Sequence, residues 1–510
     1  MAPQQRRHPE RSETRFARPT ESKVCSERAR APERTAESNG DLPLPPAPRR
    51  RATHPSRVLR ASLALRPPVT FAIPLEDLAC AALFAFFAMQ GSIPGIAPSQ
   101  ALEITGSAPT SLTTWGGIAT QVLANGLILV LLFRRPRLLL RHLLTLPCAA
   151  LLGLLAVAST AWSLAPLLTL RRALPFALAG LFGLWFAQRF PPQRRHAILR
   201  FAFLALAFAT IAVVACAPSI GLDHSPGHAA DWQGVFTQKN ACGRIMVLAT
   251  AVLLFGERLT AARALSLALF LFVLLMSGSR GAWIVEAALL LLWLALQLGR
   301  RITARARTAL AAGAPLAAAA CAVLAAALYS HFAAFFGRDL TLSGRTAIWA
   351  QVARFIARRP LIGYGYDAFW RGFTGPSLQI DSAVHFVVEH AHNGFLEILL
   401  ELGVLGLALF LLSWTRAVAR LWPLWRRGLI AEIAFPLAFL LLIILYDLDE
   451  NTLLIYNGIF WPLYVAALTS VRQLSVAGDR HHAAPGLSRE ILASPSGGFT
   501  PAAEDARPSP

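Results

Sequence analysis

The sequence predicts an all-α integral membrane protein with about twelve transmembrane helices and one large extracytoplasmic loop. Hydrophobic residues make up 55% of its 510 residues and charged residues 15%, a balance typical of chains that lie largely in lipid. Apolar runs of roughly 17–25 residues, the length that crosses the hydrocarbon core as a helix, recur through the middle of the chain. Arginine clusters alternate with loops that have none, as expected for repeated crossings.

The predicted spans follow one another through the middle of the chain, and two pairs of them are joined by very short turns. These pairs are 143–160 with 168–187 and 259–276 with 281–298. The full set is 72–90, 113–133, 143–160, 168–187, 197–217, 241–255, 259–276, 281–298, 308–329, 393–414, 430–447 and 453–470.

The formal net charge of +20 is unevenly distributed. Arginines follow the even-numbered spans up to the tenth, whereas residues 91–112 and 446–457 contain neither Lys nor Arg. By the positive-inside rule, even-numbered spans end in the cytoplasm and both termini are cytoplasmic. Topology and the bilayer surface therefore explain the basic balance, and no nucleic-acid partner is predicted.

The composition divides the chain into a membrane body and two tails. Residues 1–66 are rich in Arg, Pro, Glu and Ser and predict a disordered cytoplasmic tail, and residues 472–510 predict a second one. Between them we expect helices 1–9 in 67–330, a large outer loop in 331–391 and helices 10–12 in 392–471. The six cysteines show no C-x-x-C spacing, so no structural metal site is predicted.

The large outer loop contains a predicted amphipathic helix that begins at Ser343–Trp349. Trp349, Val352, Phe355 and Ile356 would share one face, so we expect the helix to lie along the membrane surface. A tight aromatic turn, Gly363–Asp367, follows.

Several cations lie at the predicted outer face. Lys239, one of two lysines in the chain, precedes the sixth span, and Arg280 occupies the short turn before the eighth. Arg171 and Arg172 lie just inside the fourth span. Ionisable groups at such depths are costly unless they pair with a counter-charge or bind a ligand, the alternative being snorkelling toward headgroups.

A histidine-rich segment, 385–393, precedes the tenth span. Imidazole is the side chain best suited to proton transfer near neutral pH. The segment holds three imidazoles and a carboxylate, but H-E-x-x-H is absent and the spacing of His385, Glu389 and His390 is one residue longer than H-x-x-E-H. On a helix His385 and His390 would point about 140° apart, which disfavours joint metal ligation. For His392, a structural capping role is the alternative to chemistry.

Polar and small residues continue into the tenth span. Carboxylates and an amide recur every four residues, and two glycines would then let a neighbouring helix approach closely. The polar stripe is Glu389, Asn393, Glu397 and Glu401, and the glycines are Gly403 and Gly406.

Together these motifs resemble the O-antigen ligase/polymerase superfamily of bacterial envelope glycan enzymes over roughly residues 110–470. The element Gly234–Asn240 is particularly similar to exopolysaccharide-type polymerases. The matching motifs are H-[NSQ]-x9-G-x-x-[GTY] at His392, Asn393, Gly403 and Gly406, W-S-x-x-P at Trp162–Pro166, G-x-F-x-x-K-N at Gly234–Asn240, S-R-G at Ser279–Gly281 and S-G-R-x-x-x-W at Ser343–Trp349.

The resemblance implies a metal-independent glycosyltransferase without a cofactor, similar to membrane-embedded GT-C enzymes. It would sit in the bacterial inner membrane with a periplasmic loop and active face. The donor would be a glycan on undecaprenyl pyrophosphate and the acceptor a sugar hydroxyl of a glycan or of lipid A–core. A flippase and a chain-length regulator are candidate partners. Ligase, polymerase and protein-glycan transfer stay open, because the motifs are common to all three.

The chemistry of the donor suggests roles for the polar residues. Pyrophosphate is a good leaving group, so catalysis needs cations for the developing charge and a base for the hydroxyl. We expect His392 to be the base or to position the acceptor, and Arg280 to clamp the pyrophosphate, provided that both face one cavity away from the cytosol. Asn393 and Glu389 would orient His392. Further substrate-binding candidates are Lys239, Asn240, Arg345, Arg172 and Arg244.

A multi-spanning transporter or lipid-linked oligosaccharide flippase is the alternative of another class. Such proteins place ionisable residues near the bilayer midplane, on broken helices in repeated halves. Here the polar residues gather at one face and in one loop, which favours the enzyme.

Overall fold

The computed structural model describes residues 74–92, 112–136, 146–224, 230–256, 260–310, 312–313, 345–372 and 374–483. All of these lie in the unit His54–Pro510. Within these ranges the chain is helical and has no strand, apart from an isolated antiparallel bridge between Leu222 and Trp232. The predicted tail 1–66, most of the predicted span 308–329 and residues 484–510 lie outside the described ranges.

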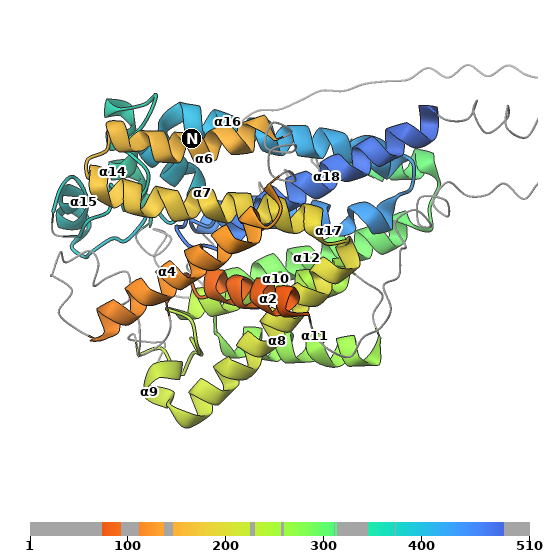
Figure 1. The fold of residues 1–510 in the computed structure, drawn as a ribbon, viewed down its shortest axis with the longest axis horizontal. Coiled ribbons are helices and arrows are strands. Elements are labelled where there is room, and N and C mark those ends of the chain that lie inside the picture. The colour runs from red at the N-terminus through yellow and green to blue at the C-terminus, as the bar shows by residue number, and fades with distance from the viewer. Residues whose placement is uncertain are drawn as a thin grey trace, which may run out of the picture. The chain divides into compact units, whose positions relative to one another are not determined.

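Eleven of the predicted spans coincide with a helix (Figure 1). Seven helices are long and apolar enough to cross a bilayer, so the chain is an all-helical integral membrane protein, and twelve crossings stay a prediction. These seven are α4 (Leu112–Phe133), α7 (Pro166–Arg189), α8 (Pro192–Cys216), α10 (Lys239–Gly256), α12 (Arg280–Gly299), α16 (Gly394–Arg426) and α17 (Ile430–Asp449). The others are α2 (Leu75–Ala88), α6 (Pro147–Ala158) with the 3-10 turn η1 (Ser159–Ala161), α9 (Pro218–Gly221), α11 (Ala261–Met276), α14 (Arg345–Arg358), α15 (Ser377–Val384) and α18 (Phe460–Ala483).

Prolines define the short turns between neighbouring helices. α6, α7 and α8 begin at Pro147, Pro166 and Pro192, the first helical position, where a missing N–H costs nothing and the fixed φ suits the helix. The closely spaced spans 143–160 and 168–187 are therefore separate helices, α6 and α7.

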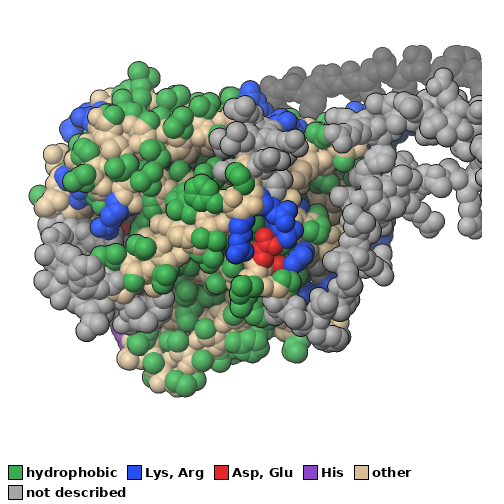
Figure 2. Space-filling view, in the orientation of Figure 1, with side chains coloured by type: hydrophobic (Ala, Val, Ile, Leu, Met, Phe, Trp, Pro, Cys, Tyr) green, Lys and Arg blue, Asp and Glu red, His purple; other side chains and the backbone are tan. Residues whose placement is uncertain are grey.

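α10 is the most enclosed of the seven spanning helices. In α10, 83% of residues are buried, compared with 22% in the apolar window of α4. α10 packs against α8, α11, α12 and α17. Outward-facing residues of other helices are apolar, for example Leu123 and Ile284, which are 71% and 72% exposed. Figure 2 shows such hydrophobic side chains spread over the visible face, with Lys and Arg in separate patches, as expected for a surface in contact with lipid.

Small residues let α7 and α18 pack closely. A Cβ on Gly183 would lie 2.0 Å from the carbonyl oxygen of Pro462, and one on Gly180 would lie 2.7 Å from the indole nitrogen of Trp461. The Trp461 ring stacks on Phe176 with centroids 4.5 Å apart. This contact fixes the C-terminal helix against the middle of the bundle.

α16 is broken at Gly403, whose φ of 66° and ψ of −167° are accessible to glycine and strongly unfavourable for other residues. The backbone groups freed by the break bond to residues 360–365: Val404 N–H donates to Pro360 O (2.8 Å), and Gly365 N–H donates to Glu401 O (2.9 Å). A Cβ on Gly403 would lie 2.3 Å from the carbonyl of Leu361. The expectation that a neighbouring helix approaches Gly403 is therefore wrong; a loop does so, because broken-helix backbone at membrane depth needs partners from the protein.

The predicted amphipathic helix is α14, but protein rather than lipid covers its apolar face, and its position at the membrane surface stays a prediction. Ile348, Val352 and Phe355 are buried in a small hydrophobic cluster with Tyr364, Phe369 and other residues of 364–400. The apolar face is thus covered by the outer loop itself.

The last predicted span begins too early and ends too early. α18 starts at Phe460 and continues to Ala483, into the predicted tail. Residues 450–459 form a loop with buried polar side chains, including Asn451 and Thr452. The Asp447 carboxylate accepts from the backbone N–H (2.8 Å) and the hydroxyl (2.7 Å) of Thr452, which ends α17 and directs the following residues inward.

Candidate active site

The histidine loop, residues 390–393, is held at the start of α16. Asn393 is the N-cap: its side-chain oxygen accepts from the N–H groups of Phe395 (3.1 Å) and Leu396 (3.0 Å). Its amide nitrogen donates to Leu448 O in the last turn of α17 at 3.2 Å. His392 has a φ of 48°, a left-handed conformation that histidine tolerates better than most residues. The cap therefore sets the loop and joins the ends of two helices.

Ala391 is anchored through both polar groups of its backbone. Its N–H donates to the Glu397 carboxylate at 2.7 Å, and its carbonyl accepts from the indole N–H of Trp349 at 2.9 Å. Because Ala391 separates His390 from His392, these bonds orient both imidazoles.

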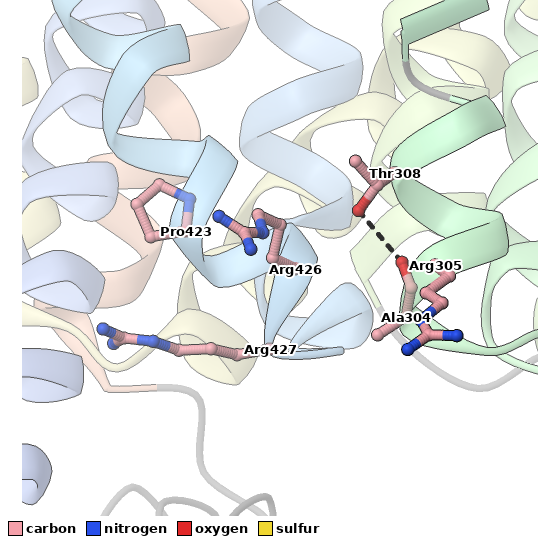
Figure 3. A pocket seen from close by; sticks show the side chains of 6 residues that line it. All are labelled: Ala304, Arg305, Thr308, Pro423, Arg426 and Arg427. Atoms are coloured by element: carbon pink, nitrogen blue, oxygen red, sulfur yellow. Dashed lines mark hydrogen bonds between the residues drawn. The ribbon is translucent and has the colours of Figure 1, made fainter.

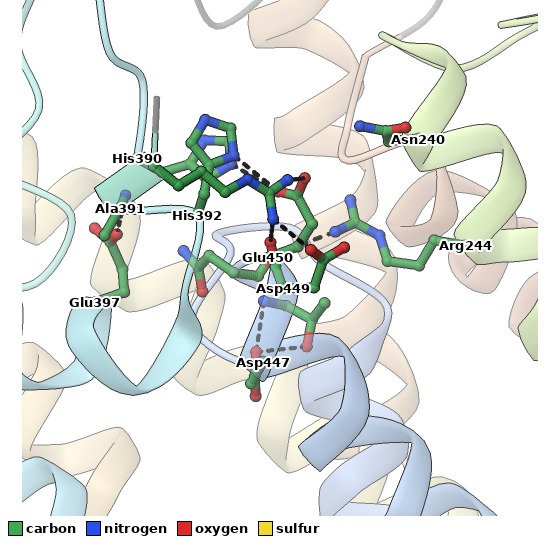
Figure 4. Close-up of polar contacts among 12 residues, drawn as sticks. Asn240, Arg244, His390, Ala391, His392, Glu397, Asp447, Asp449 and Glu450 are labelled. Carbon is green, nitrogen blue, oxygen red and sulfur yellow. Dashed lines mark hydrogen bonds and ion pairs between the residues drawn. The ribbon is translucent and has the colours of Figure 1, made fainter. Parts of the chain in front are cut away.

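Glu450, just after α17, is the hub of the site (Figure 4). One carboxylate oxygen lies 2.9 Å from His390 Nε2 and 3.3 Å from His392 Nδ1. Its other oxygen accepts from the Arg345 guanidinium at 3.2 Å. The two imidazole rings are close, with centroids 4.1 Å apart. One buried carboxylate thus binds three basic side chains, two from the histidine loop and one from α14.

The electrostatics of this hub follow from burial and pairing. Burial acts to raise the pKa of Glu450, but hydrogen bonds from His390 and His392 and their charges outweigh it and hold that pKa well below its usual range. Burial acts to lower the pKa of His390, yet its bond to Glu450 and the nearby carboxylates raise it overall. Glu450 is therefore an ionised acceptor, and each facing ring nitrogen carries the proton of its hydrogen bond.

Arg345 and Trp349 explain the spacing of the motif at Ser343–Trp349. Lying four residues apart, they share one side of α14, where Trp349 bonds to Ala391 and Arg345 reaches the end of α17. Besides Glu450, Arg345 bonds to the carbonyl oxygen of Asp449 at 2.6 Å and to its carboxylate.

The start of α12 lies beside the same acidic pair. A Cβ on Gly281 would lie 2.7 Å from the Asp449 carboxylate, so Arg280 is at the same end of the bundle as His392. Arg280 is exposed, and within the described ranges no hydrogen bond or ion pair engages its guanidinium. The neighbouring Ser279 donates to Asn240 Oδ1 at 3.0 Å. The start of α10 is thus joined to this turn.

Three other basic side chains that the sequence predicts to bind substrate already bond to groups of the protein. Lys239 forms an ion pair of 2.6 Å with Asp231, and buried Arg172 pairs with Asp367 at 3.2 Å. Arg244 points from α10 toward the end of α17 (Figure 4) and donates to Asn451 O at 3.4 Å.

The predicted polar stripe is not one helical face. α16 begins at Gly394, so Glu389 lies outside the helix and is exposed, whereas Glu397 and Glu401 are buried beneath the loop. The carboxylate that faces His392 belongs to Glu450 rather than to Glu389.

Sequence reasoning missed Glu450, Asp449 and the part that His390 plays with them. The signal was present: Asp447, Asp449 and Glu450 fall within four residues at the end of an apolar span, where ionisable groups are costly. The positive-inside rule counts Lys and Arg and draws no attention to acids in such a loop.

A metal alternative now has a different set of ligands from the one the sequence suggested. In the described part of the chain, the ligand atoms of His390, His392 and Glu450 lie within 4.8 Å of one another, close enough to share one ion. His385 and Glu389 do not belong to this group. Arg345, bound to the same carboxylate, disfavours a cation there.

The fold and site define a multi-pass membrane protein with its candidate site residues gathered at one end of a helical bundle. Residues 265–411, which include Arg280, Arg345 and His392, match the family described as O-Antigen ligase. This segment therefore belongs to the O-antigen ligase/polymerase superfamily, as its motifs predicted.

Curated relatives agree over a shorter stretch. "Exopolysaccharide production protein ExoQ" of Rhizobium meliloti (strain 1021) is 40% identical over 80 residues, which cover 14% of this chain and 18% of that protein. "Putative polysaccharide ligase RP358" of Rickettsia prowazekii (strain Madrid E) is 46% identical over 70 residues, 13% of this chain and 17% of the relative. The chain thus matches less than a fifth of the length of these relatives.

Proposed function

We propose that this protein is a membrane glycosyltransferase that moves a glycan from undecaprenyl pyrophosphate to an acceptor sugar hydroxyl at the periplasmic face of the bacterial inner membrane. The observation that carries the proposal is the His392–Glu450 contact at the end of the bundle where Arg280 lies. The names of the relatives, an exopolysaccharide production protein and polysaccharide ligases, support a polysaccharide as the product.

His392 is the proposed base. Since ionised Glu450 accepts from Nδ1–H, the neutral ring keeps its lone pair on Nε2, which is free to take the proton of the acceptor hydroxyl. The acceptor oxygen then bonds to the anomeric carbon as the bond from that carbon to the pyrophosphate oxygen breaks. Glu450 stabilises the imidazolium that forms, and undecaprenyl pyrophosphate leaves with the bonding electron pair.

The charge on the departing pyrophosphate needs cations at the same place. Arg280 is the best candidate, because it is exposed, precedes the Gly281 backbone that lies against Asp449, and makes no hydrogen bond or ion pair within the described ranges. Guanidinium binds phosphate oxygens bidentately and stays charged at every relevant pH. Arg244 and Arg345 lie at the same end of the bundle, but hydrogen bonds to the protein hold them in place. They therefore add positive electrostatic potential at the pyrophosphate site rather than a direct bond to a phosphate oxygen.

The test is a transfer assay with purified protein, lipid-linked donor, sugar acceptor and a chelator. A longer glycan made in the presence of chelator supports a metal-independent transferase, whereas movement of donor across a vesicle without bond formation would favour the flippase. His392→Ala should insert and bind donor yet lose turnover; full wild-type turnover would remove the base assignment.

The acceptor is tested in the same assay. Similarity to the exopolysaccharide protein and the Gly234–Asn240 element favour a second lipid-linked repeat, that is, a polymerase. Offering lipid A–core in parallel distinguishes this from ligase activity by the size of the product.

A further inference from the structure

The loop 360–363, between α14 and the aromatic turn, presents apolar side chains that the described part of the chain leaves uncovered. Leu361 and Ile362 are 70% and 40% exposed. On α16, Val404 and Leu405 are 50% and 46% exposed. The N–H group of Leu405 donates to the carbonyl of Leu361 at 3.2 Å, so the two segments are neighbours and their exposed side chains form one apolar patch.

The backbone of this loop is suited to an apolar medium, because three consecutive carbonyl groups are hydrogen-bonded within the protein. Besides the carbonyl of Leu361, the carbonyl of Pro360 accepts from Val404 N–H at 2.8 Å. The carbonyl of Ile362 accepts from the indole N–H of Trp162 at 3.0 Å. Irregular backbone is tolerated at membrane depth where such groups find partners in the protein.

The length of α16 places the patch at the level of the bilayer. Figure 3 shows Arg426 and Arg427 at the C-terminal end of this helix. Residues 394–415 contain no Lys or Arg, so Arg416 is the first basic residue on the way to that end. Leu405 lies roughly 16 Å before Arg416 at about 1.5 Å per residue, and the hydrocarbon layer is about 30 Å thick. The patch is therefore below the boundary on the side of the histidine loop.

α7 gives a second measure of the level of the loop. Its 24 residues, from Pro166 to Arg189, extend about 36 Å, so the segment just before Pro166 lies at the headgroup boundary. In that segment Leu164 N–H donates to the carbonyl of Tyr364 at 3.1 Å, and Trp162 bonds to the loop itself. Tryptophan is enriched at this level of membrane proteins. The loop thus extends from the boundary into the hydrocarbon.

Two exposed arginines precede the loop, at the end of α14. The Arg358 guanidinium lies 4.8 Å from the Phe355 ring, and the Arg359 guanidinium lies 5.0 Å from the Tyr364 ring. Within the described ranges neither arginine forms an ion pair with a carboxylate. Long basic side chains next to exposed apolar ones are typical of segments that lie at a bilayer interface, where the charge reaches the headgroups.

We propose that the loop 360–363 inserts into the lipid leaflet on the side of the histidine loop, with Leu361 and Ile362 against acyl chains and Arg358 and Arg359 at lipid phosphates. Lipid is the partner that fits, because the patch continues onto the exposed surface of a spanning helix. α14 ends immediately before the loop, so insertion anchors to the bilayer a helix that contributes to the candidate site. The inference rests on helix lengths and exposed side chains and is independent of the proposed transfer chemistry.

Photo-crosslinking of the full chain in vesicles of equal parts phosphatidylglycerol and phosphatidylcholine tests the insertion. p-Benzoylphenylalanine replaces Leu361, and mass spectrometry measures the phospholipid attached after irradiation. The same replacement at Leu123, on the exposed side of α4, is the positive control, and at Glu389, an exposed polar position, the negative control. The yield at 361 should match that at 123. A yield no higher than at 389, or attachment mainly to a second copy of the chain, would overturn the insertion.

The lipid selectivity at position 361 tests the arginines. Because basic residues near a bilayer attract anionic lipid, more phosphatidylglycerol than phosphatidylcholine should be attached, and Arg358→Gln/Arg359→Gln should lower this ratio about threefold or more. Arg134→Gln/Arg135→Gln, which removes two exposed arginines after α4, is the matched control and should keep the ratio. An unchanged ratio in the first pair, or an equal fall in both pairs, would contradict the phosphate contact.

Discussion

Replacing Glu450 by Gln tests whether this carboxylate activates His392. The change keeps the shape of the side chain but removes the charge that three basic groups share, at 2.9 Å from His390, 3.2 Å from Arg345 and 3.3 Å from His392. The amide also offers N–H groups, which would favour a His392 ring with its proton on Nε2. Both effects oppose proton transfer to Nε2.

The expected loss follows from the charge that His392 acquires in the transition state. A unit charge pair about 4 Å apart interacts by about 4 kcal/mol at an effective dielectric constant near 20. Arg345 and His390 share the same carboxylate, so we take about 2–4 kcal/mol, which corresponds to a fall in kcat of roughly 30- to 1,000-fold. KM for the donor should change less than kcat, since Glu450 bonds to His390, His392 and Arg345 and not to Arg280, the proposed pyrophosphate clamp.

The assay is the initial rate of transfer from lipid-linked donor, with kcat and KM determined separately. Glu389→Gln is the matched control, because Glu389 is an exposed carboxylate next to His390 that does not bond to His392. It should keep turnover within a few-fold of wild type. A Glu450→Gln protein with near wild-type kcat, or an equal loss in Glu389→Gln, would refute the reasoning.

Three further predictions concern stability and the division of labour among the cations. The pKa of His390 is raised in the folded state, so this side chain stabilises the fold fully below pH 6.5, the ordinary pKa of histidine. That stabilisation is lost as pH rises through the raised pKa. The pKa of Glu450 is lowered, so the stabilisation from this carboxylate persists above pH 4.5. The Tm should therefore fall between pH 6 and pH 9, and His390→Gln should flatten this dependence; an unchanged slope would contradict it. Gly403→Ala should lower the free energy of unfolding by about 1–3 kcal/mol or more, because a Cβ at this position would clash with Leu361. Gly126→Ala in α4 is the control and should not lower it, because the space around Gly126 is open. Equal Tm values for the two variants would disprove the role of the break. Arg280→Gln should reduce turnover without changing the Tm. Arg172→Gln should instead destabilise the protein by about 1–3 kcal/mol, because the buried Arg172 guanidinium bonds to both the carbonyl (2.9 Å) and the carboxylate (3.2 Å) of Asp367; a lower Tm in Arg280→Gln and an unchanged one in Arg172→Gln would contradict these roles.

The helices were predictable because lipid imposes a simple rule on the chain. A backbone that crosses hydrocarbon must satisfy its own hydrogen bonds, so an apolar run of sufficient length becomes a helix whatever its neighbours are. The predicted span 430–447 became Ile430–Asp449, and 281–298 became Arg280–Gly299. The predicted start of the last helix at 453 was wrong. Polar residues after Glu450 form hydrogen bonds within the protein, and a hydropathy profile contains no information about such bonds.

The sequence by itself determined that this is a helical membrane protein, that its site-forming motifs belong to the glycan ligase and polymerase superfamily, and that His392 stands at the mouth of a helix. Tertiary structure decided which charged side chains pair with one another. His392 and Glu450 are 58 residues apart, and Arg345 and Glu450 are 105 apart, on segments that meet through the packing of α14, α16 and α17. Hydropathy and motif spacing describe each segment separately, whereas the pairing of charges depends on distances that exist after the helices have packed.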